Sequence, residues 1–232
     1  MLFKDQSMKK YFLLVFFCLS IVSLLKGQKT DRAAWFSVEV SGKVSNNLEL
    51  ELEEEIRFFK DVTEIDRIIT SLGAAYTITD FLKAGAGYSL ILDHKVKQDV
   101  YENRHRYYLY LRGRVRLGGF KIDLREKFQS TYYDPAFDDE RYSPANELKS
   151  RLQVSRNFKK AGLEPYVNAE MYYQLNDPEG NKIDQMRYTA GMEIDLTKSL
   201  VLDPFFRIET DINIPEPETF YIGGVTLKWE IN

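Results

Sequence analysis

Cysteine and histidine are almost absent from this chain of 232 residues. The single cysteine, Cys18, lies in an apolar stretch near the N-terminus, so the remainder of the chain can form neither disulfides nor cysteine metal sites. Two histidines, His94 and His105, are all that is left for histidine chemistry. Phosphate-binding loops, nucleotide-binding fingerprints and zinc motifs are also missing. We therefore expect no cofactor and no metal.

Long apolar runs are missing too, apart from one segment at residues 11–25 that follows two lysines. A positive region, a short apolar region and then a small residue, here Gly27, are typical of a secretory signal peptide. We predict a signal peptide over residues 1–27, cleaved after Gly27, and one β-barrel domain over residues 28–232. A retained inner-membrane anchor is the alternative, but the run is short for a membrane helix.

An excess of positive charge is the third absence. The formal net charge is −3, and removal of the signal peptide, which carries four lysines and one aspartate, changes it to −6. A mildly acidic chain lacks the basic surface that a general nucleic-acid-binding protein needs. We therefore expect no nucleic-acid partner.

What the chain does contain is strict alternation of apolar and polar residues, over about 11–14 positions at a time. In segment 120–133, FKIDLREKFQSTYY, one face is mostly apolar and the other is charged or polar. A period of two indicates a strand with its two faces in different environments. Such runs exceed the usual strand of a soluble protein and match the roughly 9–11 residues of a tilted membrane-crossing strand. Since only a closed barrel satisfies strand backbones in lipid, the pattern predicts an outer-membrane β-barrel.

Eleven segments show this pattern, and their connections are short and longer in turn. They cover residues 33–43, 48–59, 65–77, 82–92, 103–117, 120–133, 146–158, 163–175, 184–196, 200–212 and 220–231. Short turns at one rim and longer loops at the other are typical of bacterial barrels, whose short turns are periplasmic. The fold class is therefore all-β, an up-and-down antiparallel transmembrane β-barrel of about 10–12 strands. Because eleven strands require a parallel closure, we expect ten or twelve.

Two residues conflict with this register, because Glu54 and Glu126 fall on the apolar face. A lipid-facing carboxylate costs on the order of 1–3 kcal/mol, so we expect a β-bulge that returns each side chain to the lumen. The 15 tyrosines and 15 phenylalanines gather near many segment ends, as in the aromatic girdles of membrane barrels. The alternative is the aromatic-rich core of a soluble periplasmic barrel that binds an apolar ligand.

The inward positions are densely charged and form two ladders. The acidic ladder consists of Glu49, Glu51, Glu53 and Glu55. The basic ladder consists of Arg104, Arg106, Arg112, Arg114, Arg116 and Arg125. In one interpretation the ladders set a transverse field across a pore for polar solutes. In the other, which we favour at this charge density, their mutual ion pairs plug a narrow lumen.

Catalytic chemistry finds little support in the sequence. Outer-membrane lipases and lipid A deacylases use a serine and a histidine on the outer wall. His105 faces outward in our register, and pairing about the turn at 118–119 sets it opposite position 132, with Ser130 as a diagonal neighbour. A histidine of the aromatic girdle explains this better, so we expect no enzyme. A wall-facing lipid-modifying enzyme is the alternative.

Short motifs add a resemblance. They are Trp35-Phe36-Ser37, the segments 45–50 and 54–58, Gly85-Ala86-Gly87-Tyr88, and Arg104-His105-Arg106-Tyr107. These motifs resemble the outer-membrane family known as domain of unknown function 2490. The resemblance implies an outer-membrane barrel without an established activity, and it supplies no catalytic residues.

Together these patterns predict a porin-like barrel of the bacterial outer membrane, exported through the cleaved signal peptide. Its expected role is structural or the passage of small solutes. Its expected partners are outer-membrane lipid, the barrel-assembly machinery and an unidentified polar small solute.

Overall fold

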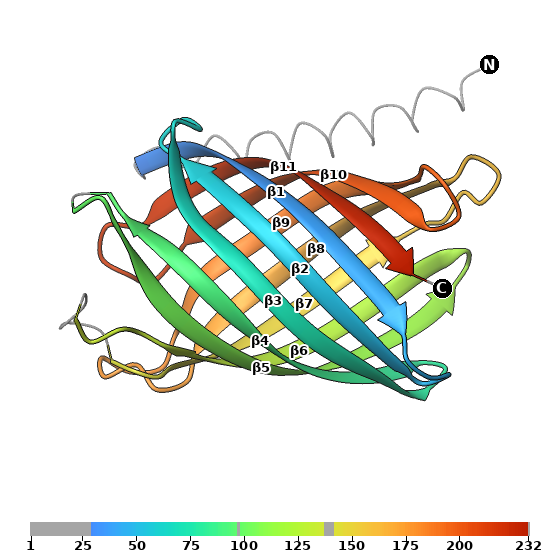
Figure 1. Cartoon of the computed structure of the whole chain (residues 1–232), viewed down its shortest axis with the longest axis horizontal. Coiled ribbons are helices and arrows are strands. Elements are labelled where there is room, and N and C mark those ends of the chain that lie inside the picture. Colours follow the sequence, from blue (N-terminus) through green and yellow to red (C-terminus); the bar gives the residue numbers. More distant parts are fainter. Residues whose placement is uncertain (1–28, 97, 137–141, 232) are drawn as a thin grey trace, which may run out of the picture.

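The computed structural model describes residues 29–96, 98–136 and 142–231, which form one closed barrel of eleven strands (Figure 1). The predicted signal peptide lies outside these residues. Within the described ranges, no helix is long and apolar enough to cross a membrane. The strands are β1 (Lys29–Lys43), β2 (Leu48–Phe59), β3 (Glu64–Thr79), β4 (Leu82–Lys95), β5 (Val100–Leu117), β6 (Phe120–Tyr132), β7 (Ala145–Ser155), β8 (Leu163–Gln174), β9 (Ile183–Asp195), β10 (Leu200–Asp211) and β11 (Glu218–Ile231).

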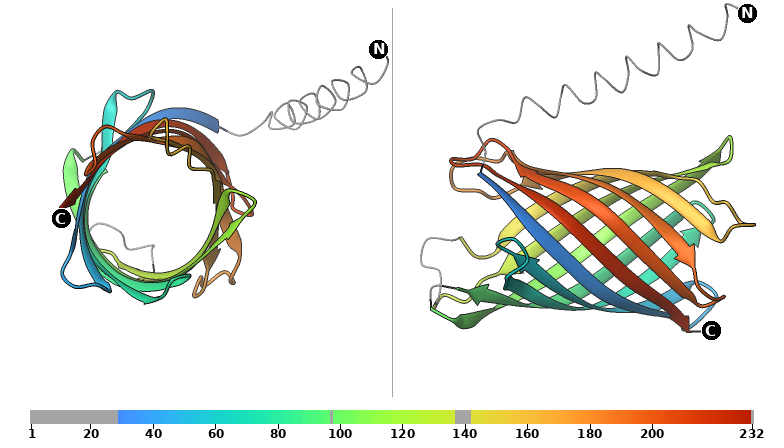
Figure 2. Two further views of the ribbon diagram at one scale, coloured as in Figure 1. Left: turned by 90° about the vertical axis from the view of Figure 1, so that its right-hand side faces the viewer. Right: turned by 90° about the horizontal axis from the view of Figure 1, so that it is seen from above.

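The barrel closes through a parallel pair. All other neighbouring strands are antiparallel, but β1 and β11 run in the same direction, from Lys29 opposite Glu218 to Gly42 opposite Ile231. The prediction of an all-β barrel of about 10–12 strands is confirmed, whereas the expectation of an even number is wrong. A parallel ladder also pairs the backbone groups of both edge strands, so closure does not require an even count. Figure 2 shows the closed ring and the tilt of the strands.

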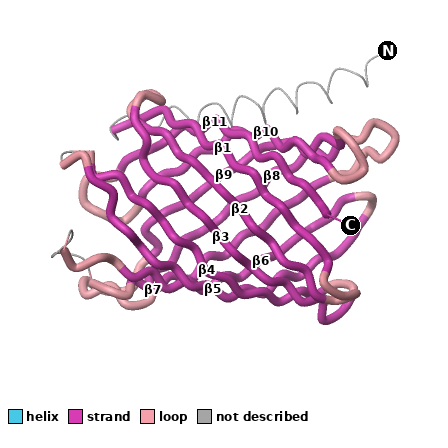
Figure 3. The backbone as a smooth tube through the Cα atoms, in the orientation of Figure 1, coloured by secondary structure: helices cyan, strands magenta, loops and turns pink. Residues whose placement is uncertain are grey.

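The connections gather at two rims (Figure 3). The turn rim carries the connections after β1, β3, β5, β7 and β9, and the loop rim carries those after β2, β4, β6, β8 and β10. A two-residue turn joins β5 to β6 through Gly118 and Gly119, whose φ angles are 57° and 83°. Two consecutive positive φ angles suit a two-residue hairpin turn, and glycine adopts them without steric cost.

Burial in this barrel is the reverse of that in a soluble protein. On the outer wall, Leu109 and Val167 are 60% and 58% exposed, although both are strongly apolar. Inside the barrel, Glu102 and Asp123 are buried, with 0% and 2% of their surface exposed. Since apolar side chains are normally hidden from water and carboxylates are not, the outer wall is suited to hydrocarbon.

Glu54 and Glu126 stay on the outer wall, so the expectation of a bulge at each is wrong. Their pairings with the neighbouring strands continue without a register shift at these positions. Each carboxylate instead accepts a hydrogen bond from a hydroxyl on the next strand. The Thr70 hydroxyl donates to Glu54 at 2.7 Å, and the Ser150 hydroxyl donates to Glu126 at 2.5 Å. A hydrogen bond from a neighbouring hydroxyl thus offsets part of the energetic cost of each lipid-facing carboxylate.

Candidate functional site

The loop-rim half of the lumen contains a cavity of about 1100 Å³. Its walls are mostly polar, and the lining includes Trp35, Arg57, Arg106, Lys149 and Arg187, which come from five different strands. In an antiparallel barrel, alternate residues of every strand point inward, so the lumen collects charged residues that are distant in sequence.

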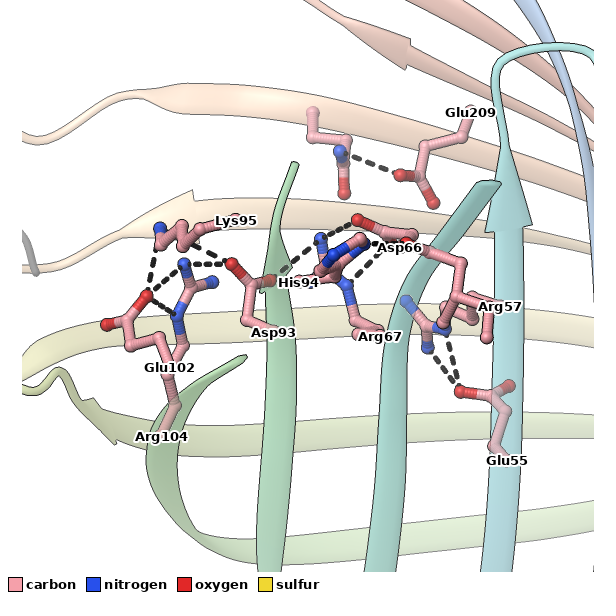
Figure 4. Close-up of polar contacts among 12 residues, drawn as sticks. Glu55, Arg57, Asp66, Arg67, Asp93, His94, Lys95, Glu102, Arg104 and Glu209 are labelled. Carbon is pink, nitrogen blue, oxygen red and sulfur yellow. Dashed lines mark hydrogen bonds and ion pairs between the residues drawn. The ribbon is translucent and has the colours of Figure 1, made fainter. Parts of the chain in front are cut away.

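Arg104, the first residue of the basic ladder, is neutralised at the loop rim. Its Nη2 atom donates to Asp93 at 2.5 Å and to Glu102 at 2.8 Å (Figure 4). Lys95 lies 2.9 Å from Glu102, and Arg67 lies 3.6 Å from Asp93. These strands are neighbours, so the network forms beside the wall and does not cross the lumen.

Three more residues of the basic ladder are also held by nearby acids. The Nε atoms of Arg112 and Arg114 both donate to Oδ1 of the buried Asp123, at 2.7 and 2.8 Å. Arg125 donates to Glu170 at 2.7 Å. Another residue of the ladder, Arg116, is exposed at the turn-rim end of β5.

Among the residues that the structure describes, the acidic ladder on β2 has ion-pair partners only at its two ends. Glu49 lies 3.0 Å from Lys83 of β4. Glu55 lies 2.7 Å from Arg57, which belongs to the same strand. Both partners therefore come from the same side of the barrel as the ladder itself.

Three acids in this region keep no charged partner. Glu51 and Glu53 form the middle of the acidic ladder, and Glu39 of β1 lies directly opposite Glu53. Within the part of the chain that the structure describes, none of the three has an ion pair within 4.0 Å or a side-chain hydrogen bond. They form an acidic wall on β1 and β2, defined here as Glu39, Glu51 and Glu53.

Among the described residues, three inward cations of β5, β6 and β7 likewise have no carboxylate within 4.0 Å. Arg106 donates to the Thr131 hydroxyl at 3.1 Å, and Lys127 Nζ lies 3.9 Å from the centre of the Tyr108 ring. Arg151 has neither a side-chain hydrogen bond nor an ion pair among residues 29–96, 98–136 and 142–231. We call Arg106, Lys127 and Arg151, on β5, β6 and β7, the basic wall.

The two ladders therefore do not neutralise each other. In the described ranges, no ion pair joins a residue of the acidic ladder to a residue of the basic ladder. This contradicts the mutual ion pairs that we expected between the two ladders. The reason is spacing, since adjacent strands lie about 4.8 Å apart and offer closer partners than strands across the barrel.

Between the ladders, two tyrosines lie against the wall of the barrel. Tyr108 and Tyr110 of β5 stand opposite Gly87 and Gly85 of β4. A Cβ atom on either glycine would overlap the ring of its tyrosine, and the Tyr108 hydroxyl reaches the next glycine, Gly73 of β3. Glycine at these positions therefore lets the rings lie across neighbouring strands instead of projecting into the lumen.

Residues 32–211 match the family model described as "Protein of unknown function (DUF2490)". The chain belongs to this family. The match confirms the resemblance drawn from the short motifs. No curated protein matches the chain.

Solved structures share the barrel architecture of this DUF2490 protein only distantly. "KdgM porin" gives a TM-score of 0.44 at 14% identity and covers 75% of this chain and 81% of that one. "Bacterial polysaccharide outer membrane secretin" gives 0.44 at 15% identity, with 75% and 72% covered. "OmpT (in-vitro folded), an outer membrane protein of Vibrio cholerae" gives 0.42 at 10% identity, with 75% and 59% covered. None of these structures is similar enough for its solute to be assigned to this family.

His105 lies on the outer wall of this DUF2490 protein, opposite Tyr132, as the hairpin pairing predicts. Its Nδ1 atom and the Tyr88 hydroxyl share a hydrogen bond of 2.7 Å. Ser130 stands opposite Tyr107 and, among the described residues, has no side-chain hydrogen bond to His105. The structure thus gives this histidine an aromatic hydrogen-bond partner.

Sequence reasoning missed part of both walls in this DUF2490 protein. Glu39 and Arg151 were not assigned to a ladder. Glu39 follows uncharged inward residues on its strand, and Arg151 follows Glu147 and Lys149, so its inward run carries both signs. The signal was present in the alternation of segments 33–43 and 146–158, where both residues fall on the inward parity.

Proposed function

We propose that this protein is a non-catalytic barrel of the outer membrane through which small polar solutes pass. One observation supports this most directly, namely that the acidic wall and the basic wall face each other without ion pairs. A charge in a dry interior is costly unless it is paired and hydrogen-bonded. Six such side chains favour a hydrated lumen over a packed plug.

The outer-membrane location rests on the apolar outer wall and on the predicted signal peptide. Leu109 and Val167 belong to a surface that water would disfavour. This surface argues against a soluble periplasmic barrel. Outer-membrane lipid and the barrel-assembly machinery are accordingly the proposed partners, with the turn rim on the periplasmic side.

Conductance in planar lipid bilayers tests the proposal. We expect stepwise current increments when the refolded mature protein inserts, together with swelling of proteoliposomes in a small neutral sugar. A correctly folded protein that produces neither result would overturn solute passage and leave a structural role. Folding is checked by a heat-dependent shift on detergent gels.

Cell fractionation tests the location separately. We expect the protein to remain in the outer-membrane fraction until detergent is added. Release by washing without detergent would contradict the membrane location and support the soluble alternative.

A further inference from the structure

The two unpaired walls of the lumen carry opposite charges, and β6 and β7, which carry Lys127 and Arg151, lie across the ring from β1 and β2. From this arrangement we infer that the lumen prefers short zwitterionic solutes whose amino and carboxylate groups are well separated, such as a tripeptide with free ends. The amino group is held toward Glu39, Glu51 and Glu53, and the carboxylate toward Arg106, Lys127 and Arg151. This inference rests on the proposed function and names its solute class.

The acidic wall lacks cations because its neighbours on adjacent strands cannot supply them. Glu51 stands opposite Ser41 and Gly73. Glu53 stands opposite Glu39 and Ser71, so two carboxylates face each other directly. Like charges at directly opposed positions destabilise a sheet.

In the part of the chain that the structure describes, the one cation paired in register with this wall forms ion pairs with other acids. Lys228 of β11 is opposite Glu39, but its Nζ atom lies 2.8 Å from both Glu193 and Asp203. Glu39 therefore does not form an ion pair with this lysine. Among the described residues, the wall is a group of three carboxylates without an ion pair within 4.0 Å.

The basic wall is built in the same way. Lys127 stands opposite Lys149, and Arg151 stands opposite Arg125. Arg151 also stands opposite Glu170, but that carboxylate already accepts from Arg125. The positive charges are therefore adjacent, and the nearest acid is occupied.

The arrangement of the strands makes the resulting field transverse. In the closed order of eleven strands, β6 and β7 lie four or five strands from β1 and β2, whereas β5, which carries Arg106, lies three strands from β2. Charges of opposite sign across a lumen with low-dielectric walls focus the field between them. A solute with two separated charges is attracted by both walls, whereas a solute with one charge is attracted by one wall only.

The width of the lumen favours separated charges over a single amino acid. A barrel of eight strands is already just wide enough to be filled by side chains, and the diameter grows with strand number. An extended chain spans about 3.3–3.6 Å per residue, so the ends of a tripeptide lie roughly 10 Å apart. Tyr108 and Tyr110, which lie flat between the walls, leave this space open and offer a surface for the peptide.

Four peptides of nearly equal size test the inference on the refolded mature protein in planar bilayers. They are trialanine, N-acetyl-trialanine, trialanine amide and N-acetyl-trialanine amide. We expect trialanine to block the ion current at a concentration about tenfold lower than the doubly blocked peptide, which corresponds to ~1.4 kcal/mol. Each singly blocked peptide should fall between the two.

Paired substitutions then show which end of the peptide each wall recognises. Glu51→Gln with Glu53→Gln should make trialanine and N-acetyl-trialanine block the current at equal concentrations. The free amino group then no longer meets these two carboxylates. Lys127→Gln with Arg151→Gln should do the same for trialanine and its amide. Lys159→Gln with Lys160→Gln removes two charges from a turn outside the strands and should change neither comparison.

The outcomes separate the two proposals. A conducting channel that all four peptides block equally overturns the zwitterion preference and leaves solute passage intact. A folded protein without any current overturns both. If a lumen variant does not fold, the comparison of the four peptides on the unmodified protein still decides the preference.

Discussion

The ring of Tyr110 occupies the space that a Cβ atom on Gly85 would need, on the neighbouring strand of the barrel. We expect Gly85→Val to push this ring into the lumen and lower the single-channel conductance. Overpacking should also reduce stability by roughly 1–3 kcal/mol. Gly113→Val is the matched control, because no atom lies within 4 Å of the added Cβ position. Equal conductance of both variants would contradict the role of the glycine.

The carboxylate of Glu54 is expected to reduce the stability of the barrel, because it faces lipid. Replacement by leucine should raise the free energy of unfolding in vesicles by about 1–2 kcal/mol. Thr70→Val should lower it, since the carboxylate would then lose its hydrogen bond. Urea titration of both variants measures the two effects. A loss of stability in Glu54→Leu would show that the carboxylate has a different role.

Asp123 is expected to contribute more to the stability of the turn-rim half of the barrel than any other acid there. Asp123→Asn leaves Arg112 and Arg114 without their shared carboxylate and should cost about 3–5 kcal/mol. Asp61→Asn breaks the exposed pair with Arg32 and should cost less than about 1 kcal/mol. Comparable losses in the two unfolding curves would be inconsistent with this difference in burial.

The outer-wall histidine should be dispensable for solute passage. His105→Ala removes the hydrogen bond to Tyr88 and should leave conductance unchanged, because the side chain does not face the lumen. We also expect the unmodified protein to leave outer-membrane lipid intact, as measured by mass spectrometry of extracted lipids. Lipid hydrolysis that disappears in both His105→Ala and Ser130→Ala would instead establish the lipid-modifying alternative.

Strand boundaries were predictable wherever lipid enforces alternation. The segments 48–59, 120–133 and 163–175 agree with β2, β6 and β8 to within one residue. At the loop rim the agreement is poorer, since β1 begins at residue 29 and not 33, and β5 begins at residue 100 and not 103. These additional residues are held by pairing with adjacent strands, which leaves no apolar pattern for the sequence to show.

By itself, the sequence determined the strands, their two faces and the sign of the charge at each inward position, because alternation along a strand is a local property. Only the tertiary structure decided the odd strand number, the parallel closure and the pairing of charges. These depend on the register between strands that are distant in the chain, such as those of Lys29 and Glu218 or of Arg125 and Glu170. Which charges remained unpaired, and so which walls face the lumen, followed from that register.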